Sequence, residues 1–304
     1  MSTITSQASF TSGNSPTDLS ALNRKQTSVG VLSVVPSPYQ RDLFAALAEH
    51  SGIELAVFYQ EDEAPDSPWP DRPLQPYETI LPGRWLGVSP RRIHVNWGLP
   101  DFTAFDVVIL NTSYLSTATQ WLMRWGLKET PWIVWAEILR SQNQPLKEWG
   151  QQVLTAPFAE ANALVAIGRQ AMNDYAIRFP EQHIANIPYH CDLSAFQEAS
   201  TAYERSDDEP IRLLCCGQMI YRKGIDLLLK AFEYVLEEGA DATLELIGRE
   251  ADLPNMLQEV SPSTRKHVIF HGFQAPEDLP SFFARADVFV LPSRHDGWGV
   301  VVNQ

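Results

Sequence analysis

Short apolar runs alternate with segments of helical periodicity along the first two thirds of the chain. Runs rich in β-branched and aromatic residues predict buried strands at 28–35, 53–59, 105–110, 131–136, 163–167 and 184–189. The segments between them predict helices from Pro38 to His50 and over 114–127, 148–161 and 169–179. Strands that alternate with helices across short connections are typical of a parallel sheet.

A second alternation follows a polar and charged stretch that ends in Pro210. It predicts strands at 211–217, 242–248, 267–272 and 287–293, and helices at 224–239, 253–260 and 276–286. We therefore expect an α/β protein with two Rossmann-like, doubly wound domains. Residues 1–27 predict a disordered tail, 28–190 the first domain, 191–210 a linker and 211–304 the second domain.

The second domain is expected to be incomplete. It has four predicted strands, whereas a six-stranded Rossmann sheet would need two more strands with their helices. The sequence stops at Gln304, about one turn into a helix predicted after the loop at 294–299. We expect this pattern from a truncated chain.

Residues 61–90 interrupt the first alternation. They are rich in Pro and Asp, and Trp69, Tyr77 and Trp85 are interspersed among them. We interpret the stretch as an irregular loop. It is either a surface excursion or a loop that contacts an acceptor substrate.

Composition excludes several classes of protein. A net charge of −14 argues against nucleic acid as a partner and against broad attachment to anionic lipid, although it leaves room for a local, peripheral membrane contact. The sequence has no apolar run of membrane-spanning length and no signal-peptide pattern at its start. Cys191, Cys215 and Cys216 lack metal-ligand spacing, and the adjacent pair predicts buried thiols in a cytoplasmic protein. We expect neither a metal nor a cofactor.

The turn after the strand at 211–217 has the features of a phosphate site. Neither first strand is followed by the G-x-G-x-x-G of dinucleotide-binding proteins, which argues against nicotinamide chemistry. Instead, Gly217 ends the strand, and Arg222 and Lys223 precede a helix. Two cations at a helix N-terminus can bind a diphosphate. The alternative is an ordinary solvated turn.

The loop after the strand at 287–293 has the features of a sugar site. Asp296 is followed by Gly297, Trp298 and Gly299, and His295 precedes it. Glycines let backbone amides approach a ligand, and a carboxylate can accept two hydroxyl hydrogen bonds from a sugar.

These stretches together resemble a known family. The sequences "GQMIYRKG", "LIG", "VIFHG" and "PSRHDGWGVVVNQ" resemble the C-terminal half of retaining nucleotide-sugar glycosyltransferases of family 4 (group 1). The sequences "SPYQRDLFAALA" and "IPYHCDLSAF" agree more loosely with the N-terminal half. The resemblance implies the GT-B fold, in which two Rossmann-like domains face a cleft.

The resemblance also implies roles for individual residues. Asp296 stands where the family has a glutamate that contacts the donor sugar, and Gln304 stands where a second glutamate contacts the ribose. Gln218 replaces an arginine that usually follows the glycine at 217. Lys223 keeps the position of the family's lysine, and Arg222 is expected to compensate for the missing arginine.

The implied reaction moves a sugar from a nucleotide diphosphate to an acceptor hydroxyl with retention of configuration. Lys223, Arg222 and the adjacent helix would stabilise the leaving diphosphate, and no divalent metal is required. The acceptor is a glycan, a lipid-linked molecule or a small molecule. Glu137, just beyond a predicted strand, is a candidate for acceptor contact. Among the histidines considered as a base, His271 is expected to be structural, while His190 and His295 stay open.

Three alternatives to an active transferase remain open at this stage. The chain is an inactive fragment of such an enzyme, or a module that only binds the donor. A phosphorylase-like enzyme shares the fold, but it would need a pyridoxal phosphate lysine outside this sequence.

Overall fold

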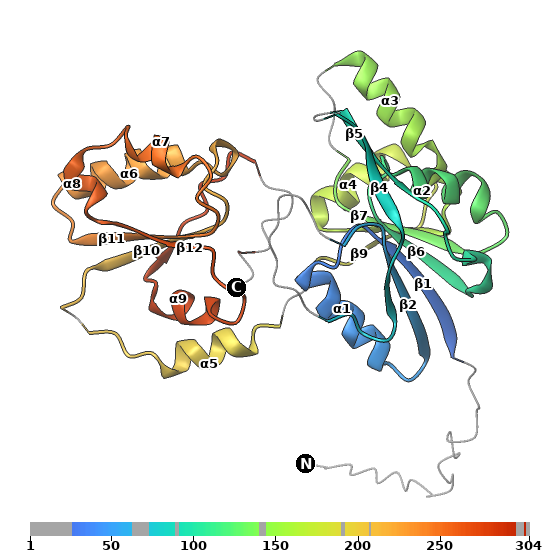
Figure 1. The fold of residues 1–304 in the computed structure, drawn as a ribbon, viewed down its shortest axis with the longest axis horizontal. Coiled ribbons are helices and arrows are strands. Elements are labelled where there is room, and N and C mark those ends of the chain that lie inside the picture. Colours follow the sequence, from blue (N-terminus) through green and yellow to red (C-terminus); the bar gives the residue numbers. More distant parts are fainter. Residues whose placement is uncertain are drawn as a thin grey trace, which may run out of the picture.

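The computed structural model describes residues 26–62, 73–88, 91–139, 144–189, 192–206, 208–295 and 301. Two parallel sheets lie in separate lobes of the ribbon (Figure 1). This arrangement confirms the predicted α/β class with two Rossmann-like units. No helix among the described residues is both long and apolar enough to cross a bilayer.

The first sheet contains seven parallel strands in the order β3-β2-β1-β6-β7-β8-β9. They are β1 (Thr27–Ser33), β2 (Ile53–Tyr59), β3 (Glu78–Ile80), β6 (Val107–Asn111), β7 (Trp132–Ala136), β8 (Ala163–Ala166) and β9 (Ile184–Asn186). Its helical segments are α1 (Pro38–Glu49), η2 (Phe102–Ala104), α2 (Thr117–Trp121), the π-helical turn η3 (Leu122–Gly126), α3 (Pro145–Thr155), η4 (Ala156–Glu160) and α4 (Arg169–Arg178).

Both faces of this sheet are buried, which explains the continuous apolar runs of its strands. Val31 belongs to a core cluster that includes Phe44 of α1. The next residue, Leu32, points to the opposite face and belongs to a cluster that includes Leu122 of η3 and Tyr175 of α4. Helices on both sides therefore hold the strands in a fixed register.

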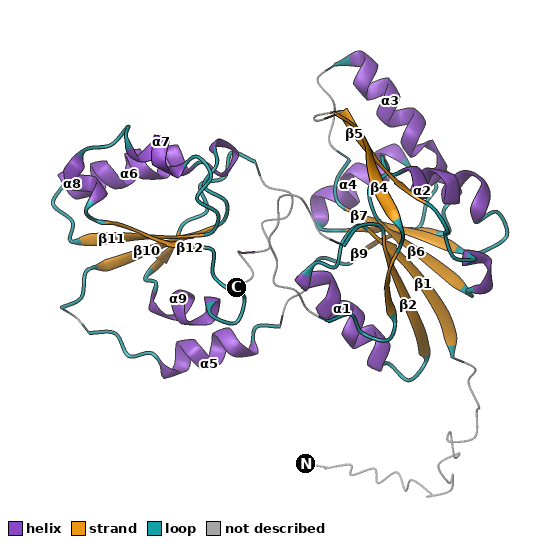
Figure 2. Cartoon of the chain, viewed as in Figure 1, coloured by secondary structure: helices purple, strands orange, loops and turns teal. Residues whose placement is uncertain are grey.

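The second sheet contains four parallel strands in the order β12-β11-β10-β13. They are β10 (Ile211–Cys216), β11 (Ala242–Ile247), β12 (Val268–Gly272) and β13 (Val288–Phe289). Its helical segments are α5 (Ser194–Ala202), η5 (Tyr221–Lys223), α6 (Ile225–Glu237), α7 (Leu253–Leu257), α8 (Pro262–Arg265) and α9 (Leu279–Arg285). Figure 2 shows α6, α7 and α8 on one side of this sheet and α5 and α9 on the other.

The interpretation of residues 61–90 as an irregular loop is wrong for the part that the structure describes. β3 extends the first sheet beyond β2. β4 (Gly83–Val88) pairs with β5 (Arg91–Asn96) in an antiparallel hairpin. Apolar side chains are exposed along this hairpin, so it lacks the regular alternation that a half-buried strand would show.

A helix occupies part of the stretch predicted as a linker. α5 packs against α9, and the rings of Phe196 and Phe283 meet edge to face with centroids 5.5 Å apart. The polar character of residues 191–210 concealed this helix, because few of its residues are apolar.

The strand predicted at 287–293 is shorter than expected. β13 pairs with β10 only through Val288 and Phe289. The amides of Asp287 and Val290, on either side of this pair, also donate to carbonyls of β10. Pro292 has no amide hydrogen to donate, so pairing cannot continue through it.

Each sheet reverses its strand order beside its first strand. The chain moves outward from β1 to β2 and β3, and then returns to place β6 on the other side of β1. In the second sheet it moves outward from β10 to β12 and returns to place β13 beside β10. Ligands of open α/β sheets bind where the order reverses, at the carboxyl ends of the strands.

A buried ion pair anchors the edge of the first sheet. The Arg41 guanidinium on α1 donates to both oxygens of Glu78 at 2.9 and 2.7 Å, and the Tyr59 hydroxyl donates to the same carboxylate at 2.7 Å. Burial alone would raise the pKa of Glu78, but the hydrogen bonds from Arg41, the Gln75 amide and Tyr59 outweigh it and hold the pKa below its usual range.

We predict that Glu78→Gln lowers the free energy of unfolding by about 3 kcal/mol at neutral pH, because it leaves the buried Arg41 charge without a counter-ion. The folded pKa of Glu78 is depressed. Its stabilisation is therefore complete above the unfolded pKa of about 4.3 and disappears as the pH falls through the folded pKa.

Chemical denaturation across pH 3–7 measures this difference. Glu259→Gln is the matched control, because Glu259 forms an exposed ion pair with Lys230 at 3.0 Å. This substitution should lower the free energy of unfolding by less than about 1 kcal/mol. Equal effects of the two substitutions at neutral pH would contradict the prediction.

Candidate functional site

The carboxyl ends of β10 and β13 bring several predicted site residues together. Gly217 follows β10 directly, and a Cβ added there would lie 3.9 Å from the side-chain carbons of Lys223. The Lys223 side chain therefore folds back over the end of β10. His295 lies near the same end, because its carbonyl accepts a hydrogen bond from Arg222 at 3.1 Å.

Lys223 also acts electrostatically on the two adjacent cysteines. Burial raises the pKa of Cys215 to about 12 and that of Cys216 to about 11, while the positive charge of Lys223 opposes both shifts. At neutral pH both thiols stay protonated. The prediction of buried thiols is confirmed for Cys215, whereas Cys216 is only partly buried.

Gly224 lets helix α6 begin close to the strand-end loop of β13. Its φ of +72° lies in the left-handed region, and a Cβ there would lie 2.1 Å from the carbonyl oxygen of Pro292. No other residue type fits this contact without movement of one of the two segments. The start of α6 and the segment that leads to His295 are therefore held together by the backbone itself.

Gly248, at the end of β11, makes a similar contact with Gly217. A Cβ at Gly248 would lie 1.8 Å from the Gly217 carbonyl oxygen, and its φ is +138°. The loops that follow β10 and β11 thus pack backbone against backbone.

Arg294 organises the site and was missed in the sequence analysis. Its guanidinium forms a two-point ion pair with Asp226 at 2.6 and 2.7 Å and lies 3.7 Å from the centroid of the Tyr221 ring. Its amide also donates to the Arg222 carbonyl at 3.0 Å. Two features of the sequence could have indicated this pair. Arg294 is a cation in the loop "PSRHDG", and Asp226 is an acidic residue in the first turn of the helix that follows β10.

This pairing changes the charge at the start of α6. Asp226 in the first turn would weaken the attraction of the helix N-terminus for an anion. The hydrogen bonds from Arg294 lower the pKa of Asp226 and offset its charge with a cation. The positive charges of Arg222 and Lys223 are then added to the helix dipole, which favours an anionic ligand.

Several predicted residues lie outside the described part of the chain. These are Asp296, Gly297, Trp298, Gly299, Gln304 and His190. The roles assigned to them stay predictions. The structure does describe His271. Its Nε2 lies 2.8 Å from the carboxylate of Glu245, so the imidazole is hydrogen-bonded within the second unit.

A second candidate site lies at the strand reversal of the first sheet. A pocket of about 310 Å³ opens at the carboxyl ends of β1, β6 and β7. Its lining consists of Val34, Gln40, Asn111, Thr112, Ser113, Tyr114, Trp135, Ala136, Glu137, Ile138, Leu139, Phe158, Ile167 and Tyr189. Glu137, predicted to contact an acceptor, is the acidic residue in this lining.

Glu137 is held from two sides. The Tyr175 hydroxyl donates to its carbonyl at 2.6 Å, and the Tyr189 hydroxyl donates to its carboxylate at 3.4 Å. Burial and the charge of Glu137 raise the pKa of Tyr189, so this hydroxyl stays protonated. The pocket therefore presents a carboxylate that a protonated tyrosine hydroxyl holds by a hydrogen bond.

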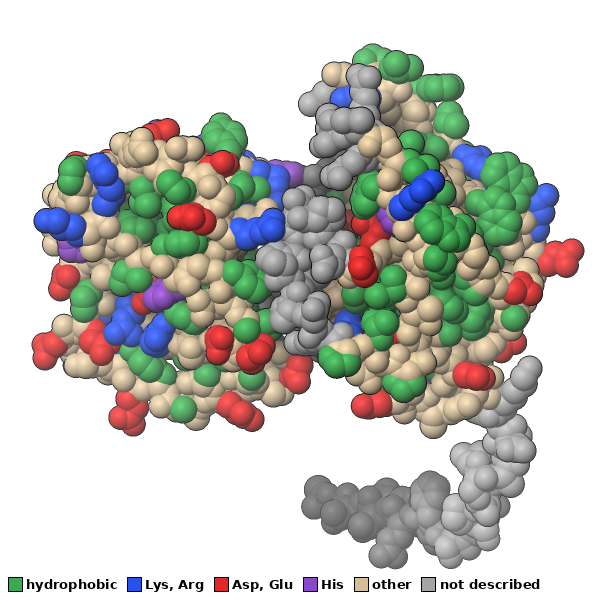
Figure 3. Space-filling view, viewed as in Figure 1, with side chains coloured by type: hydrophobic (Ala, Val, Ile, Leu, Met, Phe, Trp, Pro, Cys, Tyr) green, Lys and Arg blue, Asp and Glu red, His purple; other side chains and the backbone are tan. Residues whose placement is uncertain are grey.

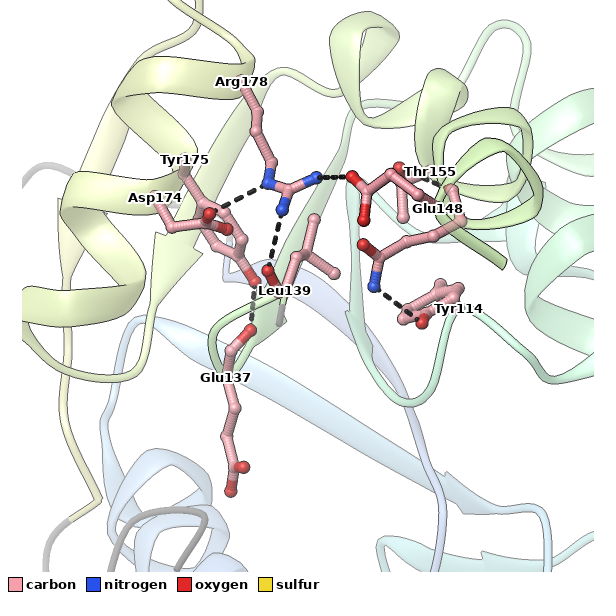
Figure 4. Close-up of polar contacts among 9 residues, drawn as sticks. Tyr114, Glu137, Leu139, Glu148, Thr155, Asp174, Tyr175 and Arg178 are labelled. Carbon is pink, nitrogen blue, oxygen red and sulfur yellow. Dashed lines mark hydrogen bonds and ion pairs between the residues drawn. The ribbon is translucent and has the colours of Figure 1, made fainter. Parts of the chain in front are cut away.

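Arg178 fixes the segment that carries Glu137. It donates to the Leu139 carbonyl at 3.1 Å and pairs with Asp174 at 2.9 Å and Glu148 at 3.5 Å (Figure 4). These contacts join α3 and α4 to the end of β7. The backbone position of Glu137 is thus set by the scaffold.

The floor of the pocket is a polar network that sequence reasoning missed. The Ser33 hydroxyl donates to Gln40 at 3.0 Å, Gln40 donates to Asn111, and Asn111 donates to the Trp135 carbonyl at 3.1 Å. Asn111 is buried, yet each of these groups has a partner. The only sequence signal was a polar residue at the end of an apolar strand.

The described residues contain no group of three or more His, Cys, Asp or Glu side chains that could hold a metal ion.

Comparisons with known proteins bear on the second unit most directly. Residues 210–304 match the family model described as "Glycosyl transferases group 1". A mannosylfructose-phosphate synthase of Agrobacterium fabrum is 32% identical over 143 residues, which covers 42% of this chain and 31% of that protein. A GDP-mannose-dependent alpha-(1-6)-phosphatidylinositol monomannoside mannosyltransferase of Mycolicibacterium smegmatis is 26% identical over 152 residues, which covers 47% of this chain and 40% of that protein. These matches thus span less than half the length of either relative.

Solved structures resemble nearly the whole chain. A UDP-forming trehalose-phosphate synthase from Burkholderia xenovorans superposes with a TM-score of 0.62 at 11% identity, over 91% of this chain and 80% of that one. The lipopolysaccharide outer core galactosyltransferase WaaB in its apo form gives a TM-score of 0.61 at 11% identity, over 91% and 77%. At this identity the likeness shows the fold, which is the two-unit GT-B arrangement.

We predict that Gly224→Ala lowers the free energy of unfolding by about 2–4 kcal/mol, since it adds a left-handed alanine and a clash with the Pro292 carbonyl. Gly239→Ala is the matched control. Gly239 has a φ of +87° but nothing within 4 Å of an added Cβ, so only the backbone cost of about 1–2 kcal/mol applies. Thermal and denaturant unfolding would measure both, and a Gly224 variant no less stable than the Gly239 variant would refute the close contact.

Proposed function

We propose that the chain transfers a sugar from a nucleotide-diphosphate donor to an acceptor hydroxyl, with retention of the anomeric configuration. The observation that carries this proposal is the match of residues 210–304 to the group 1 glycosyltransferases, together with the position of Lys223 and Arg222 at the strand reversal of the same unit. That edge is where an open α/β sheet binds nucleotides.

Lys223, Arg222 and the N-terminus of α6 would bind the diphosphate and stabilise the charge that develops on it as the glycosidic bond breaks. The loop of Gly217 and Gln218 would contact the donor from the adjacent strand end. Asp296 would accept hydrogen bonds from the sugar hydroxyls, with His295 beside it. Gly297, Trp298, Gly299 and Gln304 would complete the donor site.

The pocket of the first unit would hold the acceptor. Glu137 can accept a hydrogen bond from an acceptor hydroxyl, and the oxygen of Tyr189, whose proton is donated to Glu137, can accept another. A carboxylate and a hydroxyl side by side suit a polyol or sugar, whether free, part of a glycan or linked to a lipid.

A second candidate function is donor binding without transfer. Two substitutions favour it, because Gln218 stands where the family has an arginine and Gln304 stands where it has a glutamate. Both changes would weaken the stabilisation of the leaving group and the contact with the ribose.

Binding and transfer are separated by two measurements on the same chain. A thermal-shift panel of UDP, GDP, ADP and dTDP, each with and without attached sugars, identifies the donor. Incubation of that donor with polyols and simple glycosides then shows whether a product forms, and the anomeric proton coupling of the product shows its configuration. A donor that binds without any product or hydrolysis would leave only the second candidate, and inversion would exclude the retaining reaction.

We predict that Lys223→Ala lowers kcat/KM by about 10²–10³, the effect of losing one preorganised donor to the leaving group. Lys230→Ala is the matched control, since Lys230 lies on α6 in an exposed pair with Glu259 and should leave turnover within twofold, about the effect of an exposed ion pair. Steady-state kinetics with the identified donor measures both, and unchanged turnover in the Lys223 variant would remove that lysine from the reaction.

We predict that Asp296→Asn weakens binding of the sugar nucleotide by about tenfold, the effect of one charge-assisted hydrogen bond, and leaves binding of the free nucleotide diphosphate nearly unchanged. Calorimetry with both ligands measures the difference. Equal losses for the two ligands would show that Asp296 does not contact the sugar.

A further inference from the structure

The hairpin of β4 and β5 exposes apolar side chains on both of its faces. Leu86 and Ile93 lie opposite each other on one face, and Trp85 lies opposite His94 on the other. Trp85, Leu86 and Ile93 expose 41%, 43% and 56% of their surface. A two-stranded hairpin has little stability of its own, so a surface of this kind is expected to meet another apolar medium.

Helix α2 continues the same surface. The Thr117 hydroxyl donates to the His94 carbonyl at 3.1 Å, which places α2 beside β5. Trp121 follows Thr117 by one helical turn and therefore lies on the same side of the helix. Trp121 exposes 48% of its surface, and Trp125, one turn further along, exposes 60%.

The sequence of the hairpin is basic, although the whole protein is acidic. The chain carries a net charge of −14, yet residues 83–97 contain Arg84, Arg91, Arg92 and His94 and no Asp or Glu. Glu61 is an acidic side chain that lies beside Trp85 and His94 from outside this stretch. Residues 107–128 likewise contain Arg124 and Lys128 and no acidic residue. In Figure 3 hydrophobic side chains gather with Lys and Arg side chains over the part of the molecule where β4 and α2 lie.

We propose that the β4–β5 hairpin and α2 dock the protein on the surface of an anionic lipid bilayer. The docking face consists of Leu86, Ile93 and Arg84 on one face of the hairpin, Trp85 on the other, and Trp121 and Trp125 along the helix. Tryptophan is enriched at membrane–water interfaces, where its ring lies at the level of the headgroups. Exposed aliphatic side chains insert a short distance beyond them, and each basic residue near the surface adds attraction to anionic lipid. The aromatic, aliphatic and basic residues of this face supply all three contributions.

A protein partner or a second copy of this chain fits the face less well. The protein surface outside it is acidic on balance, and a partner of that charge could pair with Arg84, but it would leave the apolar side chains of two hairpin faces to be covered by two different surfaces. A hairpin that penetrates a fluid interface has both faces covered at once.

Sedimentation with vesicles tests the proposal without any sugar nucleotide or acceptor, so the result is independent of the proposed transferase activity. We expect the chain to bind vesicles of phosphatidylcholine mixed with phosphatidylglycerol, to bind vesicles of phosphatidylcholine alone at least about fivefold less, and to dissociate at high salt. Absence of binding to the mixed vesicles, or equal binding to both compositions, would overturn it.

Matched variants assign the binding to this face. Leu86→Ser combined with Ile93→Ser should lower the partition coefficient about tenfold, and Arg84→Glu should lower it about fivefold or more on the anionic vesicles. Ile177→Ser and Arg169→Glu are the controls, because Ile177 exposes 81% of its surface on α4 and Arg169 is exposed at the start of the same helix.

Two outcomes would contradict the assignment even if the wild-type chain binds vesicles. Equal losses in the hairpin variants and the controls would show that the lipid contact lies elsewhere. A dimer in size-exclusion chromatography that Ile93→Ser abolishes would show that a second copy covers the face. Circular dichroism melts of all variants confirm that exposed substitutions leave the fold intact.

Discussion

Parallel pairing is the constraint on which both candidate sites depend. It sends the carboxyl ends of all strands in a sheet to one edge, and the reversal of strand order beside β1 and beside β10 opens that edge at one place in each sheet. Residues distant in the sequence therefore lie close together: Arg222 contacts His295, and Asn111 and Glu137 line the same pocket. The sites follow from how the sheets are wound, and the side chains then determine what each site can bind.

Charge compensation distinguishes the two sites. At the start of α6 an acidic residue is offset by Arg294, so the local field stays positive in a protein whose total charge is strongly negative. In the pocket of the first unit the carboxylate of Glu137 has a tyrosine hydroxyl beside it. One site therefore suits an anion and the other suits a hydrogen-bond donor. The proposed transfer from a diphosphate to a hydroxyl would use both properties.

Much of the fold was predictable from the sequence, because fully buried parallel strands carry uninterrupted apolar runs. The strand at 53–59 and the helix beginning at Pro38 are both present as predicted. The β4–β5 hairpin could not be found this way, because apolar side chains lie on both of its faces and give no period. Helix α5 was missed because it buries few of its side chains and none completely.

The candidate site was predictable only in part, for a related reason. Lys223 and Gly217 are recognisable because they flank a strand and a helix in the sequence. Arg294, Gln40 and Tyr189 gain their roles from contacts between distant parts of the chain. Arg294 and Asp226 are 68 positions apart, Gln40 and Asn111 are 71 apart, and Tyr189 and Glu137 are 52 apart. The local pattern of apolar and polar residues does not predict such long-range contacts.

The contact between Gly217 and Gly248 has a consequence for how the proposed donor site can vary. Because the carbonyl of one residue fills the space where the side chain of the other would be, the two loops cannot change position independently. A residue that replaced Gly248 would touch no ligand, yet it would displace the loop of Gly217 and with it the approach to Lys223. A substitution at one glycine is therefore restrained by the other, and an evolutionary change of these two loops has to alter both together.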